Sequence, residues 1–262
     1  MRIWVTGARG MLGQAVETAV LSAGHKPLAT GHFDCPTDDI GMVRRFAYAN
    51  QPDVIINCAG RLPGAHVLDM INANTVGPHN LASLGIRLVH MSTDCVYSGA
   101  MPGSDDEDLL QSHVDQPDPT DAYGRTMLAG EPQEPHVLVV RGSFIGTKHG
   151  FLSWLLNARG DVDGWANYFW NGTTVEAMAR TLVWLAEGKR TGVVHVASQA
   201  ITTRAKLMEY FRKELNLPIS IAPVRDPFIW RALKPDIVLP RLSDALTELC
   251  KELRRLPICQ YA

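Results

Sequence analysis

Short apolar runs alternate with segments of helical periodicity along the first half of the chain. The runs are nearly continuous, whereas the segments between them repeat apolar residues at the three- and four-residue spacing of a helix. Strands are predicted at residues 3–6, 27–30, 53–58, 87–91 and 137–140, and helices at residues 11–23, 40–50 and 72–84. Strands that are apolar on both faces are typical of a parallel sheet covered by helices on both sides. The pattern therefore predicts an α/β fold with a doubly wound parallel sheet.

The second half of the chain continues the pattern less regularly. Helices are predicted at residues 173–187, 204–215 and 243–255, and a strand at residues 193–197. No flexible linker separates them from the first half, so we expect a core over residues 1–145. Residues 146–262 should complete this core and form a smaller C-terminal lobe for the substrate, which is not a separate domain. Residues 100–119, with Asp105-Asp106-Glu107-Asp108, are expected to be a solvated surface loop and not an acidic metal site.

Composition excludes several classes of protein. The 262 residues carry a formal net charge of −2, which leaves no overall basic surface for nucleic acid. No apolar run is long enough to span a membrane, and the N-terminus enters a strand without the layout of a signal peptide. The five cysteines are scattered without Cys-x-x-Cys spacing, which argues against a zinc site or a disulfide framework. We therefore expect a cytoplasmic protein without a metal, with no nucleic-acid partner and no membrane partner.

A glycine-rich turn follows the first strand. Its sequence is Thr6-Gly7-Ala8-Arg9-Gly10-Met11-Leu12-Gly13, and a helical pattern begins within it. Glycines between a strand and a helix let backbone N–H groups approach a pyrophosphate at the helix N-terminus, although glycines also serve simple turns. The position of this turn favours the first role. Residues 1–145 are thus predicted to be a Rossmann-type dinucleotide-binding core, with cofactor contacts from Gly7, Arg9, Gly10, Met11, Leu12 and Gly13.

The end of the second strand bears on the choice of cofactor. It reads Thr30-Gly31-His32, without the carboxylate that would bind the ribose hydroxyls of NAD. Arg9 is suited to face a 2′-phosphate, with a solvated loop arginine as the equal alternative. Asp34 follows slightly later and either contacts adenine or initiates a turn. We predict NADP as the cofactor, with NAD as the alternative.

Several segments together resemble one enzyme family. In chain order they are residues 7–13, Asn57-Cys58-Ala59-Gly60, residues 92–99 and Tyr123-Gly124-Arg125-Thr126. They resemble the extended short-chain dehydrogenase/reductases, and most of all their dTDP-4-dehydrorhamnose reductase branch. Residues 74–82, 141–146 and 170–174 match that branch too, and the resemblance fades after about residue 200. It implies an NAD(P)H-dependent reductase of a nucleotide-linked 4-keto-6-deoxy sugar, as in polysaccharide synthesis. A homodimer is a possible assembly.

The resemblance also assigns roles to individual residues. Hydride addition to a ketone develops an alkoxide, which needs a proton and hydrogen-bond donors. Tyr123 is implied to be the acid, and Thr93 to hydrogen-bond the carbonyl. Asn74 is implied to hold a water or a backbone kink behind the site. Further implied contacts are Ala59 and Gly60 to the cofactor, and Asp94, Val96, Tyr97 and Phe144 to the sugar.

Two departures from the family pattern bear on activity. Met127 stands four residues after Tyr123, where the family keeps a lysine that binds the nicotinamide ribose and lowers the tyrosine pKa. A methionine does neither, so we expect a weakened reductase, and a reverse oxidation that suffers more because it needs the phenolate. The stretch between Gly60 and Asn74 is also shorter than usual and lacks an acidic helix start.

Two other functions are weighed against the reductase. A non-catalytic NADP-binding regulatory or scaffold protein of the same fold is favoured by Met127 but opposed by Thr93 and Tyr123. An epimerase or dehydratase is the weaker alternative. An epimerase must reoxidise its intermediate through the phenolate, and a dehydratase would carry a glutamate where this chain has Cys95.

Overall fold

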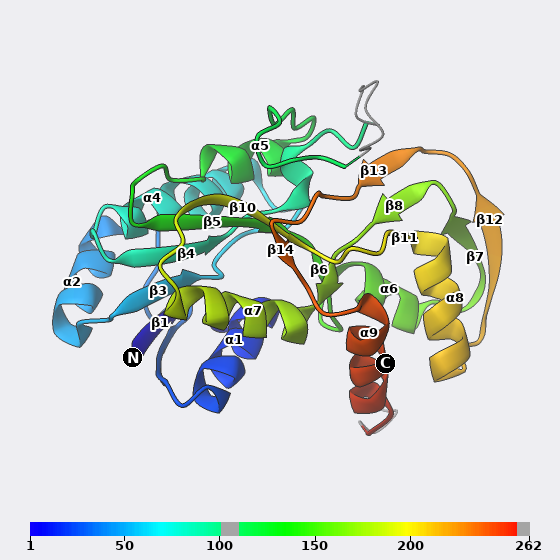
Figure 1. Cartoon of the computed structure of the whole chain (residues 1–262), viewed down its shortest axis with the longest axis horizontal. Coiled ribbons are helices and arrows are strands. Elements are labelled where there is room, and N and C mark those ends of the chain that lie inside the picture. The colour runs from blue at the N-terminus through cyan, green and yellow to red at the C-terminus, as the bar shows by residue number, and fades with distance from the viewer. Residues whose placement is uncertain (101–109, 256–262) are drawn as a thin grey trace. The chain divides into compact units, whose positions relative to one another are not determined.

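The computed structural model describes residues 1–100 and 110–255 of the chain (Figure 1). The acidic stretch at residues 105–108, predicted to be a solvated loop, lies outside the described residues, as does Cys259. No helix in the described ranges is both long and apolar enough to cross a membrane.

The largest sheet has seven strands in the order β14-β10-β5-β4-β3-β1-β2. The strands are β1 (Arg2–Thr6), β2 (Lys26–Thr30), β3 (Val54–Asn57), β4 (Arg87–Met91), β5 (Val137–Gly142), β10 (Gly192–Ala197) and β14 (Ile237–Val238). Neighbouring strands pair in parallel, for example Val5 with Ile56 across β1 and β3. Figure 1 shows α1 (Met11–Ser22) and α7 (Val175–Glu187) on one face, and α2 (Ile40–Asn50), α4 (Gly77–Ala82) and α5 (Ala122–Ala129) on the other. The predicted α/β class with a doubly wound parallel sheet is confirmed.

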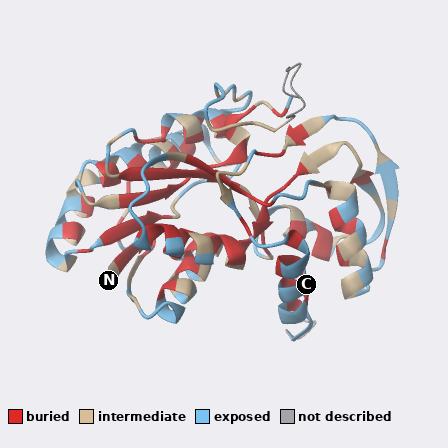
Figure 2. Ribbon diagram, viewed as in Figure 1, coloured by how far each residue is buried: buried red, intermediate tan, exposed pale blue. Residues whose placement is uncertain are grey.

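A buried apolar layer holds α2 and α4 against this sheet. Trp4, Ile55 and Leu88, from three adjacent strands, pack with residues of both helices. The Trp4 ring packs at a tilt against Phe46, with 4.5 Å between ring centroids, and Trp4 donates to the Thr30 hydroxyl at 2.9 Å. Burying each large apolar side chain contributes about 1.5–3 kcal/mol, which explains the continuous apolar strands of the sequence. Buried residues follow the strands in Figure 2.

The helix predicted at residues 72–84 begins earlier and is irregular. It comprises α3 (Val67–Met70), a π-helical turn η1 (Ile71–Val76) and α4. The hydrophobic pattern of the sequence did not predict this early start, because the apolar residues Val67 and Leu68 are exposed. The backbone irregularity expected at Asn74 is present as the π-helical turn, and the Asn74 side chain is buried.

The chain divides into two compact units, the first being Met1–Ser98, Gln116–Gly142 and Met178–Val194. The second is Gly99–Asp115, Ser143–Ala177 and His195–Ala262. In the second, α6 (Gly150–Asn157), α8 (Arg204–Leu215) and α9 (Leu242–Arg255) share a core that includes Leu152, Phe211 and Leu246. The smaller sheets are β8 (Tyr168–Trp170) with β11 (Thr202–Thr203) and β13 (Ile229–Arg231), β7 (Gly160–Trp165) with β12 (Ile219–Val224), and β6 (Phe144–Ile145) with β9 (Thr173–Thr174). The predicted division at residue 145 stays a prediction.

Candidate active site

The glycine-rich turn after β1 touches the loop after β3. Gly7 has a φ of +64°, and a Cβ atom there would lie 2.6 Å from the Ala59 nitrogen. The chain runs from β1 to β2 on one side and then crosses to β3 on the other side, so the two loops meet at the switch point between β1 and β3, where ligands bind in open α/β sheets. The structure therefore brings the predicted residues Gly7, Ala59 and Gly60 together at the carboxyl ends of the parallel strands.

The start of α1 is suited to an anion. Gly10 precedes the helix, no side chain among the described residues caps its N-terminus, and the first turn holds no acidic residue. The N–H groups of a helix's first turn have no partner within the helix, and the helix dipole favours negative charge there. The Gly10 N–H donates to the Gly7 carbonyl at 2.9 Å, so the N–H groups of Met11, Leu12 and Gly13 are the ones suited to a pyrophosphate.

Arg9 and Asp34 lie together at the end of β2. The Asp34 carboxylate accepts from the Gly31 nitrogen at 2.8 Å and is 3.7 Å from the Arg9 guanidinium. The Arg9 and Asp34 side chains are 78% and 47% exposed, so their ion pair is weak and screened by solvent. Asp34 therefore stabilises the turn, while the Arg9 guanidinium stays mostly exposed, and its contact with a 2′-phosphate stays a prediction.

Asn74 connects the loop after β3 to α5. Its side-chain oxygen accepts from the Arg61 nitrogen at 2.6 Å, and its amide nitrogen donates to the Arg61 carbonyl at 3.1 Å. The same amide donates to the Thr126 hydroxyl at 3.2 Å. The residue in the π-helical turn thus fixes the cofactor-side loop relative to the helix that holds Tyr123.

Thr93 and Tyr123 face one another at the carboxyl end of β4. The Thr93 hydroxyl accepts from the Cys95 nitrogen at 3.1 Å and so begins the short 3₁₀ helix η2 (Asp94–Val96). Asp121 caps α5, whose first turn includes Tyr123, through the Gly124 nitrogen at 2.7 Å. The Thr93 side chain lies close enough to the Tyr123 phenol to lower its pKa, against the effect of burial. The two hydroxyls predicted to serve a ketone therefore converge.

Burial raises the pKa of Tyr123 well above its ordinary value. The neighbouring Cys95 raises it further, and the hydrogen bond with Thr93 opposes this increase. None of the described groups that shift this pKa is a cation, the others being Asp94 and Asp121. Tyr123 is consequently a protonated phenol at neutral pH, ready to give a proton to an oxygen that gains negative charge.

Met127 lies one helical turn beyond Tyr123 in α5. Its side chain is 7% exposed, so a thioether fills the position beside the tyrosine. Its correspondence to the family lysine stays a prediction.

Comparison with known proteins places the chain in a family. The profile of the RmlD substrate binding domain matches residues 1–236, beyond the limit of about residue 200 expected from the motifs. This chain belongs to that family.

Individual relatives agree with this assignment. A dTDP-4-dehydrorhamnose reductase of Mycolicibacterium smegmatis is 32% identical over 222 residues, covering 78% of this chain and 66% of that one. The structure of a dTDP-4-dehydrorhamnose reductase from Bacillus anthracis in complex with NADP is similar in fold, with a TM-score of 0.83 at 19% identity, over 96% of this chain and 99% of that one. A methionine adenosyltransferase 2 subunit beta of Danio rerio is 31% identical over 143 residues, or 50% of this chain and 42% of that one. The predicted family and fold are confirmed, and the predicted oxidoreductase class and cofactor agree with the names of the reductases.

The residues predicted to contact the sugar have different surroundings. Asp94 is buried and accepts from the Thr93 hydroxyl at 3.2 Å and from the Cys95 thiol at 3.4 Å. Val96 and Tyr97 are buried, and Phe144 lies in β6 of the second unit. Sugar contacts from these four residues stay predictions.

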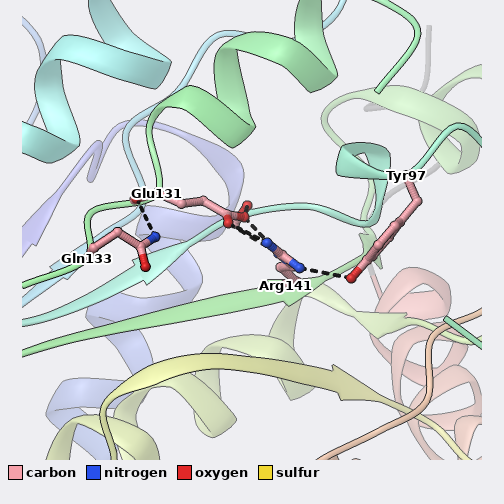
Figure 3. A network of polar contacts seen from close by, with 5 residues as sticks. Tyr97, Glu131, Gln133 and Arg141 are labelled. Atoms are coloured by element: carbon pink, nitrogen blue, oxygen red, sulfur yellow. Dashed lines mark hydrogen bonds and ion pairs between the residues drawn. The ribbon is translucent and has the colours of Figure 1, made fainter. Parts of the chain in front are cut away.

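A buried ion pair behind the site is missed by the sequence reasoning. Figure 3 shows the Arg141 guanidinium between the Glu131 carboxylate and the Tyr97 hydroxyl. Arg141 lies near the end of the otherwise apolar strand β5, and Glu131 comes just after α5. Both are charged residues in segments that are expected to be buried. That unexplained charge is the signal that could have identified the pair.

Among the residues of known placement, no group of three or more histidine, cysteine or acidic side chains is arranged to hold a metal ion.

Proposed function

We propose that this chain is an NADP(H)-dependent reductase acting on the ketone of a nucleotide-linked 4-keto-6-deoxy sugar. The observation that carries the proposal is the convergence of Thr93 and Tyr123 at the carboxyl end of β4. The loops after β1 and β3 lie at the same, carboxyl ends of the parallel strands. The names of the family relatives support the nucleotide sugar as substrate. A cytoplasmic location and a homodimer accompany this proposal as expectations.

The residues at the glycine-rich turn fit a dinucleotide phosphate. The uncapped start of α1 offers its N–H groups to the pyrophosphate, and the mostly exposed Arg9 offers a guanidinium to a 2′-phosphate. When bound, NADPH would supply the hydride for the ketone carbon.

Tyr123 and Thr93 would handle the oxygen of the ketone. The phenol of Tyr123 is protonated at neutral pH and would donate its proton as the oxygen becomes an alkoxide. The Thr93 hydroxyl has one proton, and on substrate binding it would turn this proton to the same oxygen. Without substrate, Asp94 accepts this proton at 3.2 Å and so holds the hydroxyl in the site until the ketone oxygen replaces it.

Met127, in place of a lysine, would reduce the rate of ketone reduction without abolishing the reaction. Reduction uses the protonated phenol, which this site favours without a lysine. The missing charge and ribose contacts would cost about 10²–10³-fold in rate, the usual effect of removing one electrostatic contributor.

Steady-state assays test the proposal. NADPH consumption is followed with dTDP-linked and UDP-linked 4-keto-6-deoxy sugars, using the wild type, Tyr123→Phe and Thr93→Val. We expect slow turnover by the wild type and at least a 100-fold loss in Tyr123→Phe, with NADPH affinity retained. Equal turnover by the wild type and Tyr123→Phe would reject the assigned role.

A regulatory subunit is the second candidate. The observations in its favour are Met127 and the similarity of half the chain to a protein named as a subunit of methionine adenosyltransferase. Under this alternative the chain binds NADPH but consumes none, even after Met127→Lys. Calorimetric titration of NADPH beside the turnover assay separates the two candidates.

A further inference from the structure

The buried pair of Glu131 and Arg141 connects the two segments that carry the proposed catalytic residues. Glu131 Oε1 accepts from Arg141 Nε at 2.9 Å, and Oε2 accepts from Nη2 at 2.7 Å. The remaining Arg141 nitrogen, Nη1, donates to the Tyr97 hydroxyl at 2.8 Å (Figure 3). Ser92 donates to Glu131 Oε1 at 2.6 Å. The side chains of Glu131 and Arg141 are only 2% and 5% exposed, so solvent does not reach these bonds.

The network holds both ends of the turn that carries Thr93. Ser92 directly precedes Thr93, and Tyr97 directly follows η2, with its own nitrogen donating to the Asp94 carbonyl at 3.2 Å. Glu131 follows the end of α5, and its nitrogen donates to the Leu128 carbonyl at 3.2 Å. One carboxylate therefore links the segment of Thr93 to the helix of Tyr123.

Such a pair is better suited to orientation than to stability. Removing two charges from water is costly, and apolar residues of similar volume often stabilise a protein at least equally well. An apolar pair would fill the space without fixing a direction, whereas bidentate arginine–carboxylate bonds fix both distance and angle. In addition, Glu131 outweighs the effect of burial and raises the pKa of Arg141, so the arginine keeps its charge.

We propose that Glu131 and Arg141 are positioning residues that hold the Thr93 hydroxyl against the Tyr123 phenol. This inference rests on the proposed reductase function. Loss of the pair should slow proton donation by Tyr123. It should not change the glycine-rich turn, where NADPH is proposed to bind.

The decisive variant replaces both charges by apolar side chains of similar size, Glu131→Met with Arg141→Met. Its melting temperature should be within a few degrees of the wild type, while kcat falls at least about 30-fold and the Kd of NADPH changes less than about twofold. A double variant with the kcat and melting temperature of the wild type would overturn the proposal, because apolar side chains that only fill the space would then suffice for catalysis.

A milder variant guards against loss of the fold. Ser92→Ala removes one hydrogen bond from the network, and we expect kcat to fall about tenfold with unchanged NADPH affinity. Arg87→Met is the matched control for the arginine-to-methionine change of the double variant. Arg87 is a half-buried arginine at the other end of β4 that donates to the carbonyls of Leu185, in α7, and Arg190, just after it. It should lower the melting temperature and leave kcat within about twofold. A full kcat in Ser92→Ala would count against the proposal.

Crystal structures of the wild type and the double methionine variant provide a readout that needs no turnover. If the wild type reduces none of the sugars tested, the proposed function fails, but the positions of Thr93 and Tyr123 still decide this inference. Displacement of the two hydroxyls from one another in the variant supports it. An unchanged separation overturns it.

Discussion

A Cβ atom at Gly124 would collide with the backbone carbonyl oxygen of Cys95. The helix that holds Tyr123 therefore packs directly on the turn that begins with Thr93. Gly124→Ala should force the two segments apart, lowering kcat at least tenfold and the free energy of unfolding by about 1–3 kcal/mol. Steady-state kinetics and denaturant unfolding measure both effects.

Gly188→Ala is the control for that substitution. A Cβ at Gly188 would lie 3.5 Å from its nearest neighbour, the Leu185 carbonyl, which is an ordinary contact. This variant should keep full kcat. A Gly124→Ala enzyme with wild-type kcat would show that the close packing has no bearing on catalysis.

Gly10 tests the phosphate cradle separately from the fold. A Cβ at Gly10 would meet only the Gly7 carbonyl, at 3.1 Å, whereas a Cβ at Gly13 would collide with that carbonyl. Gly10→Val should weaken NADPH binding at least 100-fold by blocking the backbone, with little change in melting temperature. Gly13→Ala should mainly lower the melting temperature. Calorimetric titration with thermal unfolding distinguishes them, and tight NADPH binding by Gly10→Val would place the cofactor elsewhere.

Arg9 tests the preference for NADP. Its guanidinium is mostly exposed and pairs only weakly with Asp34, so a 2′-phosphate would compete well for it. Arg9→Ala should weaken NADP binding about 10- to 100-fold and leave NAD binding within about threefold. Tighter binding of NAD than NADP by the wild type would contradict the preference.

The pH dependence of reduction follows from the raised pKa of Tyr123. A free tyrosine titrates near ~10, and here burial moves the pKa upward, so the protonated acid persists between about pH 6 and pH 9. Burial also lowers the pKa of His90, behind the site, to about 3, so that histidine stays neutral over the same range. We expect kcat to be flat there and to stay flat past pH 10, because the raised pKa keeps the proton on the phenol where a free tyrosine would lose it. A pH profile with an alkaline limb near neutrality would rule out Tyr123 as the acid.

The sheet and the cofactor turn could be predicted from the sequence because each has a local cause. Continuous apolar runs form buried strands, and the spacing of Gly7, Gly10 and Gly13 between a strand and a helix is readable in the chain itself. The helices predicted at residues 204–215 and 243–255 are α8 and α9, with one residue of difference at the start of α9.

Features with long-range causes were not predicted. The bonds of Glu131 to Ser92 and Arg141 join residues 39 and 10 positions apart in the chain, so neither sequence segment indicates its partner. The early start of the helix at Val67 is likewise hidden, because its exposed apolar residues break the amphipathic pattern. Tyr97 is likewise buried with its hydroxyl bonded to Arg141, which lies 44 positions away in the chain.

The most direct test of the account is the NADPH-dependent turnover of Met127→Lys beside the wild type. The new ammonium would lie on the Tyr123 face of α5, lower the pKa of the phenol and offer donors to the cofactor ribose. The ribose and nearby carbonyls would offset the cost of burying it. We predict slow turnover of a 4-keto-6-deoxy sugar nucleotide by the wild type, an increase of about 10- to 1,000-fold in Met127→Lys, and an alkaline limb at lower pH. Negligible turnover by both forms, with NADPH still bound, would contradict the reductase and favour the regulatory subunit.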